Sequence, residues 1–386
     1  MKKLIYITGT RAEYGVMETL LKKMQASDAF DVSVVVTGMH LSREHGYTLE
    51  QVEASGLRIA AVVDGHIEDS TAVGMAKSIG YEIIDIAEVL QREQPDLVLV
   101  TADRGEPLAG AIAAAHLNIP IAHISGGDTT TGATIDERLR HAITKFSDIH
   151  FPANDESAGV IVSMGENEEL VFAVGNPGVQ ESYTFSESEK AALAEKYRLD
   201  RTKPILLVIQ HPVTSTPEKA GEQMRVTLEA LKALQFQSVL TYPNADVGNA
   251  DMVKAIIEYE KESYMRIYKN IPREDFVGLM GIADAMVGNS SAALIEAPSF
   301  RLPAVNIGLR QEGRERAQNV INAPHDKGAI IAAIQKALSE DFKERISNVS
   351  NPYAQENADE KIIAILRDMD LSPALLKRKG IPNRHA

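Results

Sequence analysis

The chain has 386 residues, a formal net charge of −14, no cysteine and 44% hydrophobic residues. This length favours two domains, and the acidic balance argues against general binding to nucleic acid or to anionic membranes. Without cysteine there is no disulfide bond, thiolate nucleophile or cysteine-bound metal. No stretch approaches the roughly 18–20 apolar residues of a membrane span, and no signal peptide is recognised, so we expect a cytoplasmic protein with no membrane partner.

Continuous apolar strands alternate with helices through the first half of the chain. We expect strands at residues 4–8, 31–37, 58–63, 96–101, 119–124, 146–152 and 170–174. Helices are expected to end near residue 25, to cover residues 50–54, 71–93 and 102–117, and to begin near residue 136. This alternation is typical of βαβ units that form a parallel sheet with both faces covered.

A turn cluster at Gly175-Asn176-Pro177-Gly178 predicts a domain boundary, after which the alternation restarts. We expect strands at 205–210, 237–242, 265–268, 285–287 and 304–307, with helices at 221–234, 252–259, 276–282 and 327–338. The predicted fold is α/β, with two doubly wound Rossmann-like domains facing each other across a cleft. Their predicted ranges are 1–175 and 176–357, and a final helix within 358–386 packs back on the first domain.

The stretch 121–151 predicts chemistry, because a short strand, a Gly126-Gly127 bend, a polar loop and a helix follow one another. Asp128 lies on the bend, and Asp136 and Glu137 open the helix. Together with Asp103, which follows an earlier strand, they would form an acid/base set if they converge, since neighbouring carboxylates raise one another's pKa. The alternatives are ordinary acids at a helix start and an Asp103–Arg104 ion pair.

Candidate phosphate ligands also follow strands. Asn289-Ser290-Ser291 before a helix would combine hydroxyl groups, backbone N–H groups and the positive helix end to bind a phosphate, and a plain N-cap serine is the alternative. Other polar residues just after strands are Arg11, His40, Arg104, His211, Asn244 and Arg310, whose alternative is an ordinary surface or loop role. Glu296, in the helix after the serines, could accept both hydroxyl groups of a ribose, or it could simply be solvated.

Several common site types are excluded. The first strand is not followed by GxGxxG, and the chain lacks GxxxxGK[ST], so neither a dinucleotide dehydrogenase nor a P-loop protein is expected. His40 and His45 have poor spacing for metal ligands, so no metal site is expected.

Taken together, the motifs resemble the hydrolysing UDP-N-acetylglucosamine 2-epimerases, which make N-acetylmannosamine and UDP for sialic acid biosynthesis. The resemblance covers about residues 4–320. Its motifs are GTRAEY (9–14), MHLSREHGYT (39–48), ADRGEP (102–107), TGATIDERLRHAITKFSDIH (131–150), HPVT (211–214), YPNAD (242–246) and GNSSAALIEAPSF with LPAVNIGLRQEGR (288–314). It implies the B-type glycosyltransferase fold, a homodimer, a nucleotide-sugar substrate and no cofactor.

The resemblance also implies roles for particular residues. Arg11, His211, Ser290 and Ser291 would hold the diphosphate, and Glu296 the ribose hydroxyl groups. Phe276 would pack on the uracil, while Arg104, Asn244 and Arg310 would line the cleft. Asp103 and Asp136 match the acid/base carboxylates of the family.

Two positions depart from the family pattern. Ser125 stands where the family has an acid, in HISGGD instead of HIEGGE, and Asp128 is a candidate replacement. Thr101 stands where hydrolysing members often have histidine. We therefore predict a hydrolysing 2-epimerase of UDP-N-acetylglucosamine or a related nucleotide sugar, such as a diamino or GDP-linked one. The alternatives are a non-hydrolysing 2-epimerase, a glycosyltransferase and a nucleotide-sugar binding protein.

Overall fold

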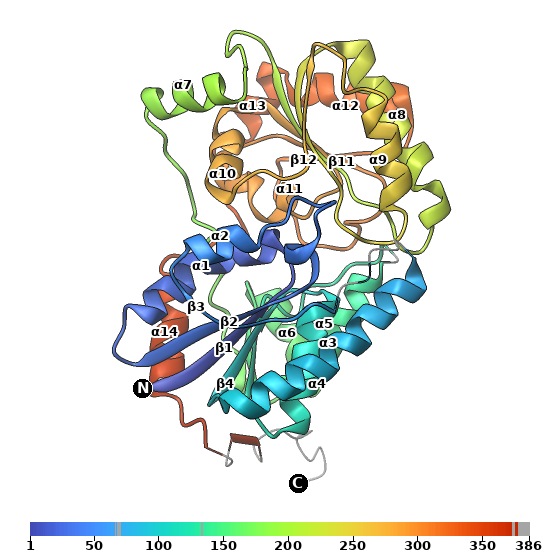
Figure 1. Ribbon diagram of the computed structural model, residues 1–386. Coiled ribbons are helices and arrows are strands. Elements are labelled where there is room, and N and C mark those ends of the chain that lie inside the picture. Colours follow the sequence, from blue (N-terminus) through green and yellow to red (C-terminus); the bar gives the residue numbers. More distant parts are fainter. Residues whose placement is uncertain (66, 68–70, 133, 373–374, 377–386) are drawn as a thin grey trace. The chain divides into compact units, whose positions relative to one another are not determined.

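A computed structural model describes residues 1–65, 67, 71–132, 134–372 and 375–376. The chain divides into two compact units (Figure 1). Unit 1 comprises Met1–Thr129, Ile135–Val179 and Tyr353–Ala386, and unit 2 comprises Thr130–Thr134 and Gln180–Pro352. Among the described residues, no helix has both the length and the apolarity needed to cross a bilayer.

Unit 1 is built on a parallel sheet of six strands in the order β3-β2-β1-β4-β5-β6. The strands are β1 (Lys2–Thr8), β2 (Phe30–Val36), β3 (Arg58–Val62), β4 (Leu97–Thr101), β5 (Ile121–Ile124) and β6 (Ile149–Phe151). The helices are α1 (Arg11–Gln25), η1 (Gly38–Leu41), α2 (Leu49–Ala54), α3 (Ala72–Glu93), α4 (Gly105–His116), α5 (Ile135–Phe146), α6 (Asp155–Ser163), η2 (Glu168–Leu170) and α14 (Ala358–Asp368). The strand order reverses between β1 and β4, which is where doubly wound proteins bind ligands.

Both faces of this sheet are buried, as the apolar strands predict. In β1, Leu4 and Tyr6 enter one core and Ile5 and Ile7 enter the other, because successive side chains of a strand point to opposite faces. Thr10 begins α1 by accepting a hydrogen bond from the Glu13 backbone N–H at 3.3 Å. The short segment Gly9-Thr10 is therefore held between the buried strand β1 before it and the capped helix α1 after it.

The last helix of unit 1, α14, lies against α1, and Figure 1 shows red α14 beside the blue start of the chain. Ile362 and Leu366 of α14 enter the core that contains Leu20, and all three are fully buried. Lys2 Nζ donates to the carbonyl oxygens of three residues at the end of α14, at 2.6–2.8 Å, and these are Leu366, Arg367 and Met369. A cation at a helix C-terminus satisfies carbonyl groups that have no partner within the helix.

Unit 2 has a second parallel sheet of six strands, in the order β12-β11-β10-β7-β8-β9. The strands are β7 (Ile205–Ile209), β8 (Gln237–Thr241), β9 (Met265–Tyr268), β10 (Ala285–Gly288), β11 (Ala304–Ile307) and β12 (Val320–Ala323). The helices are α7 (Glu187–Lys196), η3 (Pro217–Lys219), α8 (Ala220–Leu234), α9 (Asn249–Ile257), α10 (Arg273–Ile282), α11 (Ala292–Ile295), η4 (Ala297–Phe300), α12 (Lys327–Ala337) and α13 (Glu340–Arg345). Two cores cover the two faces of this sheet.

The prediction of two doubly wound α/β sheets is confirmed, and two local predictions need correction. The strand predicted at 170–174 is wrong, because only Val171 pairs, in an isolated bridge with His150. The edge strand β12 was not predicted. The short segment Thr130–Thr134 belongs to unit 2, where the Thr131 backbone N–H donates to the Glu312 carbonyl at 2.7 Å.

Candidate active site

Two neighbouring strands of unit 1 end in strained residues. Ala102 directly after β4 and Ser125 directly after β5 both have φ +62°, a left-handed conformation that costs a residue with a side chain roughly 1–2 kcal/mol. The Ala102 backbone N–H donates to the Ile124 carbonyl at 3.0 Å, and the Ser125 backbone N–H to the Phe151 carbonyl at 2.9 Å. Such strain is common at functional sites. Here it turns the chain at the sheet edge just before Asp103 and Asp128.

The buried guanidinium of Arg140 is the centre of this edge. Only 1% of its side chain is exposed. Its Nη2 donates to Asp103 Oδ2 at 2.5 Å, and its Nη1 donates to Glu137 Oε2 at 2.6 Å and to the Asp128 carbonyl at 2.8 Å. Although burial lowers the pKa of Arg140, the carboxylates of Asp103, Asp128 and Glu137 raise it overall. Arg140 therefore stays charged and balances part of the negative charge around it.

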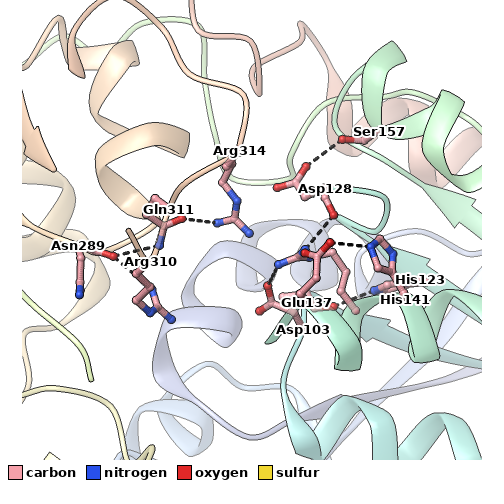
Figure 2. Close-up of polar contacts among 12 residues, drawn as sticks. Asp103, His123, Asp128, Glu137, His141, Ser157, Asn289, Arg310, Gln311 and Arg314 are labelled. Atoms are coloured by element: carbon pink, nitrogen blue, oxygen red, sulfur yellow. Dashed lines mark hydrogen bonds and ion pairs between the residues drawn. The ribbon is translucent and has the colours of Figure 1, made fainter. Parts of the chain in front are cut away.

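Outer contacts hold the same acids in place (Figure 2). Glu137 Oε1 contacts His141 Nε2 at 2.9 Å, and Asp128 Oδ1 accepts from Ser157 Oγ at 2.9 Å. Asp136 precedes Glu137 in the first turn of α5 and is buried. The structure thus brings Asp103, Asp128 and Glu137 together around one arginine. Sequence analysis assigned no role to Arg140, although its spacing of three residues from Glu137 on a helix was a usable signal.

A second group of acids in unit 1 was missed. Glu13, Glu82 and Glu106 come from α1, α3 and α4, and each is at most 8% exposed. Glu13 Oε2 accepts from the Gly9 backbone N–H at 3.4 Å. Burial and then the charge of Glu106 raise the pKa of Glu13 to about 8. Gly9 leaves room for the Glu106 side chain, because a Cβ at this position would lie 2.3 Å from the Glu106 carboxyl carbon and would displace it.

Glu82 shares the hydroxyl group of Thr37 with a backbone carbonyl. Thr37 Oγ1 lies 2.8 Å from the Val63 carbonyl and 3.0 Å from Glu82 Oε1. The Thr37 hydroxyl group has one proton, which it shares between the Val63 carbonyl and Glu82, so it compensates only part of a charge on the buried Glu82. Burial and then the charge of Glu106 raise the pKa of Glu82 well above its ordinary value, which agrees with this geometry.

The predicted basic and imidazole residues of unit 1 differ in accessibility. Arg11 is the first residue of α1 and is partly exposed. Arg104 is the residue before α4, with its Nε 3.8 Å from Glu106 Oε2. His40 is fully buried, with ring nitrogens 3.1 Å from Thr8 Oγ1 and 2.8 Å from Thr48 Oγ1. Burial lowers the pKa of His40 to about 4. These contacts favour a supporting role for His40 over direct contact with a substrate.

In unit 2, Asn289 fixes the residue that follows β7. Its Oδ1 accepts from the His211 backbone N–H at 2.7 Å, and its Nδ2 donates to the His211 carbonyl at 2.8 Å. His211 Nδ1 lies 3.1 Å from the Asn244 backbone N–H, which can only donate. The neutral ring therefore carries its proton on Nε2, the nitrogen that donates hydrogen bonds. The predicted residues His211 and Asn244 are thus directly linked.

The loop after β11 contacts the same asparagine. The Asn289 carbonyl accepts from Arg310 Nη1 at 3.3 Å and from Gln311 Nε2 at 3.0 Å, and Arg314 Nη1 donates to Gln311 Oε1 at 3.2 Å (Figure 2). Ser290 follows Asn289 and accepts from the Ala292 backbone N–H at 3.3 Å. These contacts group the predicted residues His211, Ser290 and Arg310 around Asn289. The sequence predicted Asn289 as part of the phosphate-binding segment 289–291, but not its bonds to the His211 backbone.

The other predicted residues of unit 2 are more enclosed. Ser291 lies immediately before the short helix α11, and Glu296 follows that helix in an ion pair with Arg273. Phe276 is 6% exposed within an apolar core that also contains Leu279, so it offers little of its ring to a ligand. In the part of the chain that the structure describes, no group of three or more His, Asp or Glu residues could hold a metal ion.

The family model described as UDP-N-acetylglucosamine 2-epimerase matches residues 22–367 of this chain. The chain belongs to this family. A relative from Legionella pneumophila, UDP-N,N'-diacetylbacillosamine 2-epimerase (hydrolyzing), is 38% identical over 98% of this chain and 99% of that protein. Polysialic acid biosynthesis protein P7 from Escherichia coli is 32% identical over 95% of this chain and 94% of that protein. The predicted resemblance to the hydrolysing members of the epimerase family is confirmed.

Solved structures of the epimerase family share the fold. UDP-GlcNAc 2-epimerase from Neisseria meningitidis bound to UDP-GlcNAc has a TM-score of 0.78 at 21% identity, over 94% of this chain and 99% of that one. The Methanocaldococcus jannaschii UDP-GlcNAc 2-epimerase in complex with UDP-GlcNAc and UDP gives 0.73 at 18% identity, over 94% and 99%. The predicted B-type glycosyltransferase fold is therefore confirmed.

Proposed function

We propose that the protein is a hydrolysing 2-epimerase that acts on a UDP-linked 2-acetamido sugar. The observation that carries this proposal is the position of Asp103, a carboxylate paired with the buried Arg140 at the carboxyl edge of the unit 1 sheet. A carboxylate held in this way can accept a proton without being rearranged, since its orientation is already set.

The reaction would proceed by elimination and hydration. A carboxylate removes the proton at C2 of the sugar as the C1–O bond to UDP breaks, which gives a glycal and UDP. Water then adds its oxygen to C1 and gives one proton to a carboxylate, while an acid delivers a proton to the other face of C2, so the free sugar has the manno configuration. The departing diphosphate needs positive charge and hydrogen-bond donors more than it needs a proton.

The proposed roles follow this scheme. Asp103, Asp136, Asp128 and Glu137 are the candidates for proton transfer. Glu13 joins them, because its raised pKa of about 8 keeps it protonated near neutral pH, and Asp103 is among the charges that act on it. Two kinds of carboxyl group, one ion-paired and one protonated, suit a reaction that both removes and returns a proton.

The diphosphate would be held by cations and hydrogen-bond donors. In unit 2, Ser290 and Ser291 are proposed as direct ligands, with Arg310 near them around Asn289. In unit 1, Arg11 is proposed as a direct ligand and Arg104 as a further substrate-binding residue. His211 would donate from Nε2, because its Nδ1 accepts the Asn244 backbone N–H. Glu296 is proposed to accept the ribose hydroxyl groups.

The substrate itself is proposed to be a 2,4-diacetamido sugar of the N,N'-diacetylbacillosamine type, in preference to N-acetylglucosamine. Two relatives support this, namely the Legionella pneumophila protein and the Campylobacter jejuni GDP/UDP-N,N'-diacetylbacillosamine 2-epimerase (hydrolyzing), which is 29% identical over 97% of this chain and 98% of that protein. Ser125 also replaces the family acid, so the sugar meets a hydroxyl group at this position. The Ser125 hydroxyl donates to Asn176 Oδ1, which fixes its direction.

The test is NMR spectroscopy of the full chain with UDP-N,N'-diacetylbacillosamine or UDP-N-acetylglucosamine in D2O. Free manno-configured sugar carrying deuterium at C2, together with UDP, is the expected result, and turnover should be faster with the diacetamido substrate. A UDP-linked epimer with no free UDP would reassign the protein to non-hydrolysing chemistry. Saturable binding of UDP without turnover of either sugar would contradict the proposed reaction.

We also propose that the protein is a homodimer, and its cytoplasmic location stays a prediction. On α3, Val73, Tyr81 and Ile84 are 62%, 53% and 59% exposed. Their spacing places these apolar side chains on one helix face, which supports a contact surface there. Light scattering of the wild type and of Ile84→Glu tests this, with Lys361→Glu at an exposed position of α14 as a control. A monomeric wild type would contradict it.

A further inference from the structure

His123 lies on β5 between the two elements that carry the Asp103–Arg140 ion pair. The ring is fully buried. Its Nε2 is 2.9 Å from the Ala102 carbonyl oxygen, and its Nδ1 is 3.2 Å from Thr144 Oγ1. Figure 2 labels His123 beside the acids of this edge. Ala102 immediately precedes Asp103, and Thr144 lies one helical turn after Arg140 on the same face of α5.

The hydrogen bonds fix the protonation of the ring. The Ala102 carbonyl can only accept, so Nε2 must carry a proton and donate it. Nδ1 is then free of a proton and accepts from the Thr144 hydroxyl group. Burial lowers the pKa of His123 to about 3, so the ring stays neutral and this tautomer persists through the ordinary pH range.

Ala102 needs this support more than a glycine would. Its φ of +62° is left-handed, a conformation that glycine adopts readily and that strains a residue with a side chain. The Ala102 N–H is bound by the Ile124 carbonyl, and its carbonyl by His123. Without the second bond, the peptide plane between Ala102 and Asp103 could rotate towards a less strained conformation.

We propose that His123 is a positioning residue that holds the strained Ala102 turn through its Nε2–H bond to the Ala102 carbonyl, so that the Asp103 carboxylate stays on Arg140. Its effect on turnover rests on the proposed function, whereas the tautomer and the support of the turn do not. His123 touches no reacting atom in this scheme; it acts through Ala102, and the Thr144 contact fixes the tautomer of the ring.

Two substitutions separate the two hydrogen bonds of the ring. His123→Gln places a side-chain N–H near the position of Nε2 and keeps the donor to Ala102. His123→Asn reaches only to the position of Nδ1, so it keeps a contact with Thr144 and loses the one with Ala102. Ala102→Gly removes the strain of the left-handed conformation. In the double variant His123→Asn/Ala102→Gly, loss of the hydrogen bond to the residue 102 carbonyl should therefore disturb the turn less than in His123→Asn alone.

The expected result is a loss in kcat of about 10²-fold for His123→Asn with KM changed by less than about 3-fold, since a shift of 1 Å at a reacting group has this order of effect. His123→Gln should stay within about 5-fold of the wild type, and Ala102→Gly should restore at least about 10-fold in the double variant. Thermal unfolding of each variant identifies any that fails to fold. An equal loss in His123→Gln, or no recovery with Ala102→Gly, would overturn the proposal.

A second measurement does not depend on the substrate. In a two-bond ¹H–¹⁵N spectrum of the wild type, the ring signals that disappear in His123→Gln should report a proton on Nε2 and none on Nδ1. A proton on Nδ1 would overturn the assignment of the donor. If the wild type turns over neither nucleotide sugar but shows the expected tautomer, the proposed function fails and the structural role of His123 stands.

Discussion

Replacing Arg140 by methionine should be among the most destabilising single changes in unit 1. The substitution keeps an unbranched side chain but removes a guanidinium that is 1% exposed and donates to Asp103, Glu137 and the Asp128 carbonyl. Breaking a buried ion pair by removing one partner costs about 3–5 kcal/mol. The side chains of Asp103 and Glu137 are 21% and 24% exposed, so water can partly solvate them and we expect the lower end, about 3 kcal/mol.

The assay is urea unfolding followed through assigned methyl signals of the unit 1 core, because a chain with two units need not unfold in one step. Glu137→Gln is the matched control, since it keeps an oxygen acceptor for Arg140 and removes one charge. The double variant Arg140→Met/Glu137→Gln should be less destabilised than the sum of the single changes by at least about 1 kcal/mol. An Arg140→Met protein within about 1 kcal/mol of the wild type would refute this electrostatic account.

Three further outcomes are expected. Glu13→Gln should stabilise the protein relative to the wild type, and this difference in unfolding free energy should grow between about pH 4.5 and 8 to on the order of 3 kcal/mol near pH 7, because the folded wild type has a Glu13 pKa of about 8 and loses stability as the pH rises through this range. Equal differences in unfolding midpoint at pH 5 and pH 8 would contradict this. Gly127→Ala should destabilise unit 1 by about 3 kcal/mol in the same urea assay, since Gly127 has φ +84° and a Cβ would lie 2.2 Å from the Ser157 carbonyl oxygen; a change below about 1 kcal/mol would count against that contact. Asn289→Ala should weaken UDP binding in calorimetry by about 10-fold or more, because His211 loses both backbone hydrogen bonds to the amide, and unchanged affinity would exclude this support of the site.

Local sequence patterns predicted most of the fold, because buried parallel strands are apolar along their whole length. β7 reads ILLVI and is buried throughout. The edge strand β12 reads VINA and is mostly not buried, so its pattern is weak and it was missed. At 170–174 the apolar side chains pack on the core. The Phe172 and Val174 backbone N–H groups donate to the His150 and Pro152 carbonyls, but only an isolated bridge forms there and no strand.

Only part of the candidate site was predicted, because some of its residues have a local signal in the sequence and others do not. Residues that follow strands, such as Asp103 and His211, are marked by their position at the sheet edge. Glu82 gave no such signal, since it lies in the middle of the long helix α3 and joins the buried acids only through the tertiary fold. The spacing of Arg140 from Glu137 on α5 was a local signal that was not used. The ion pairs of Arg140 with Asp103 and of Arg273 with Glu296 join segments that are distant in the sequence, so local patterns do not predict them.

The return of α14 to α1 has a consequence for how the chain folds as it is synthesised. Unit 2 is continuous from Gln180 to Pro352 apart from five residues, so nearly all of its parts leave the ribosome in one run. Synthesis of unit 1 starts first. Leu20 and its neighbours nevertheless cannot pack against Ile362 and Leu366 until the ribosome has synthesised those two residues. The first unit to be started is thus the last to be completed, and an arrested nascent chain should expose this apolar surface to chaperones until α14 emerges.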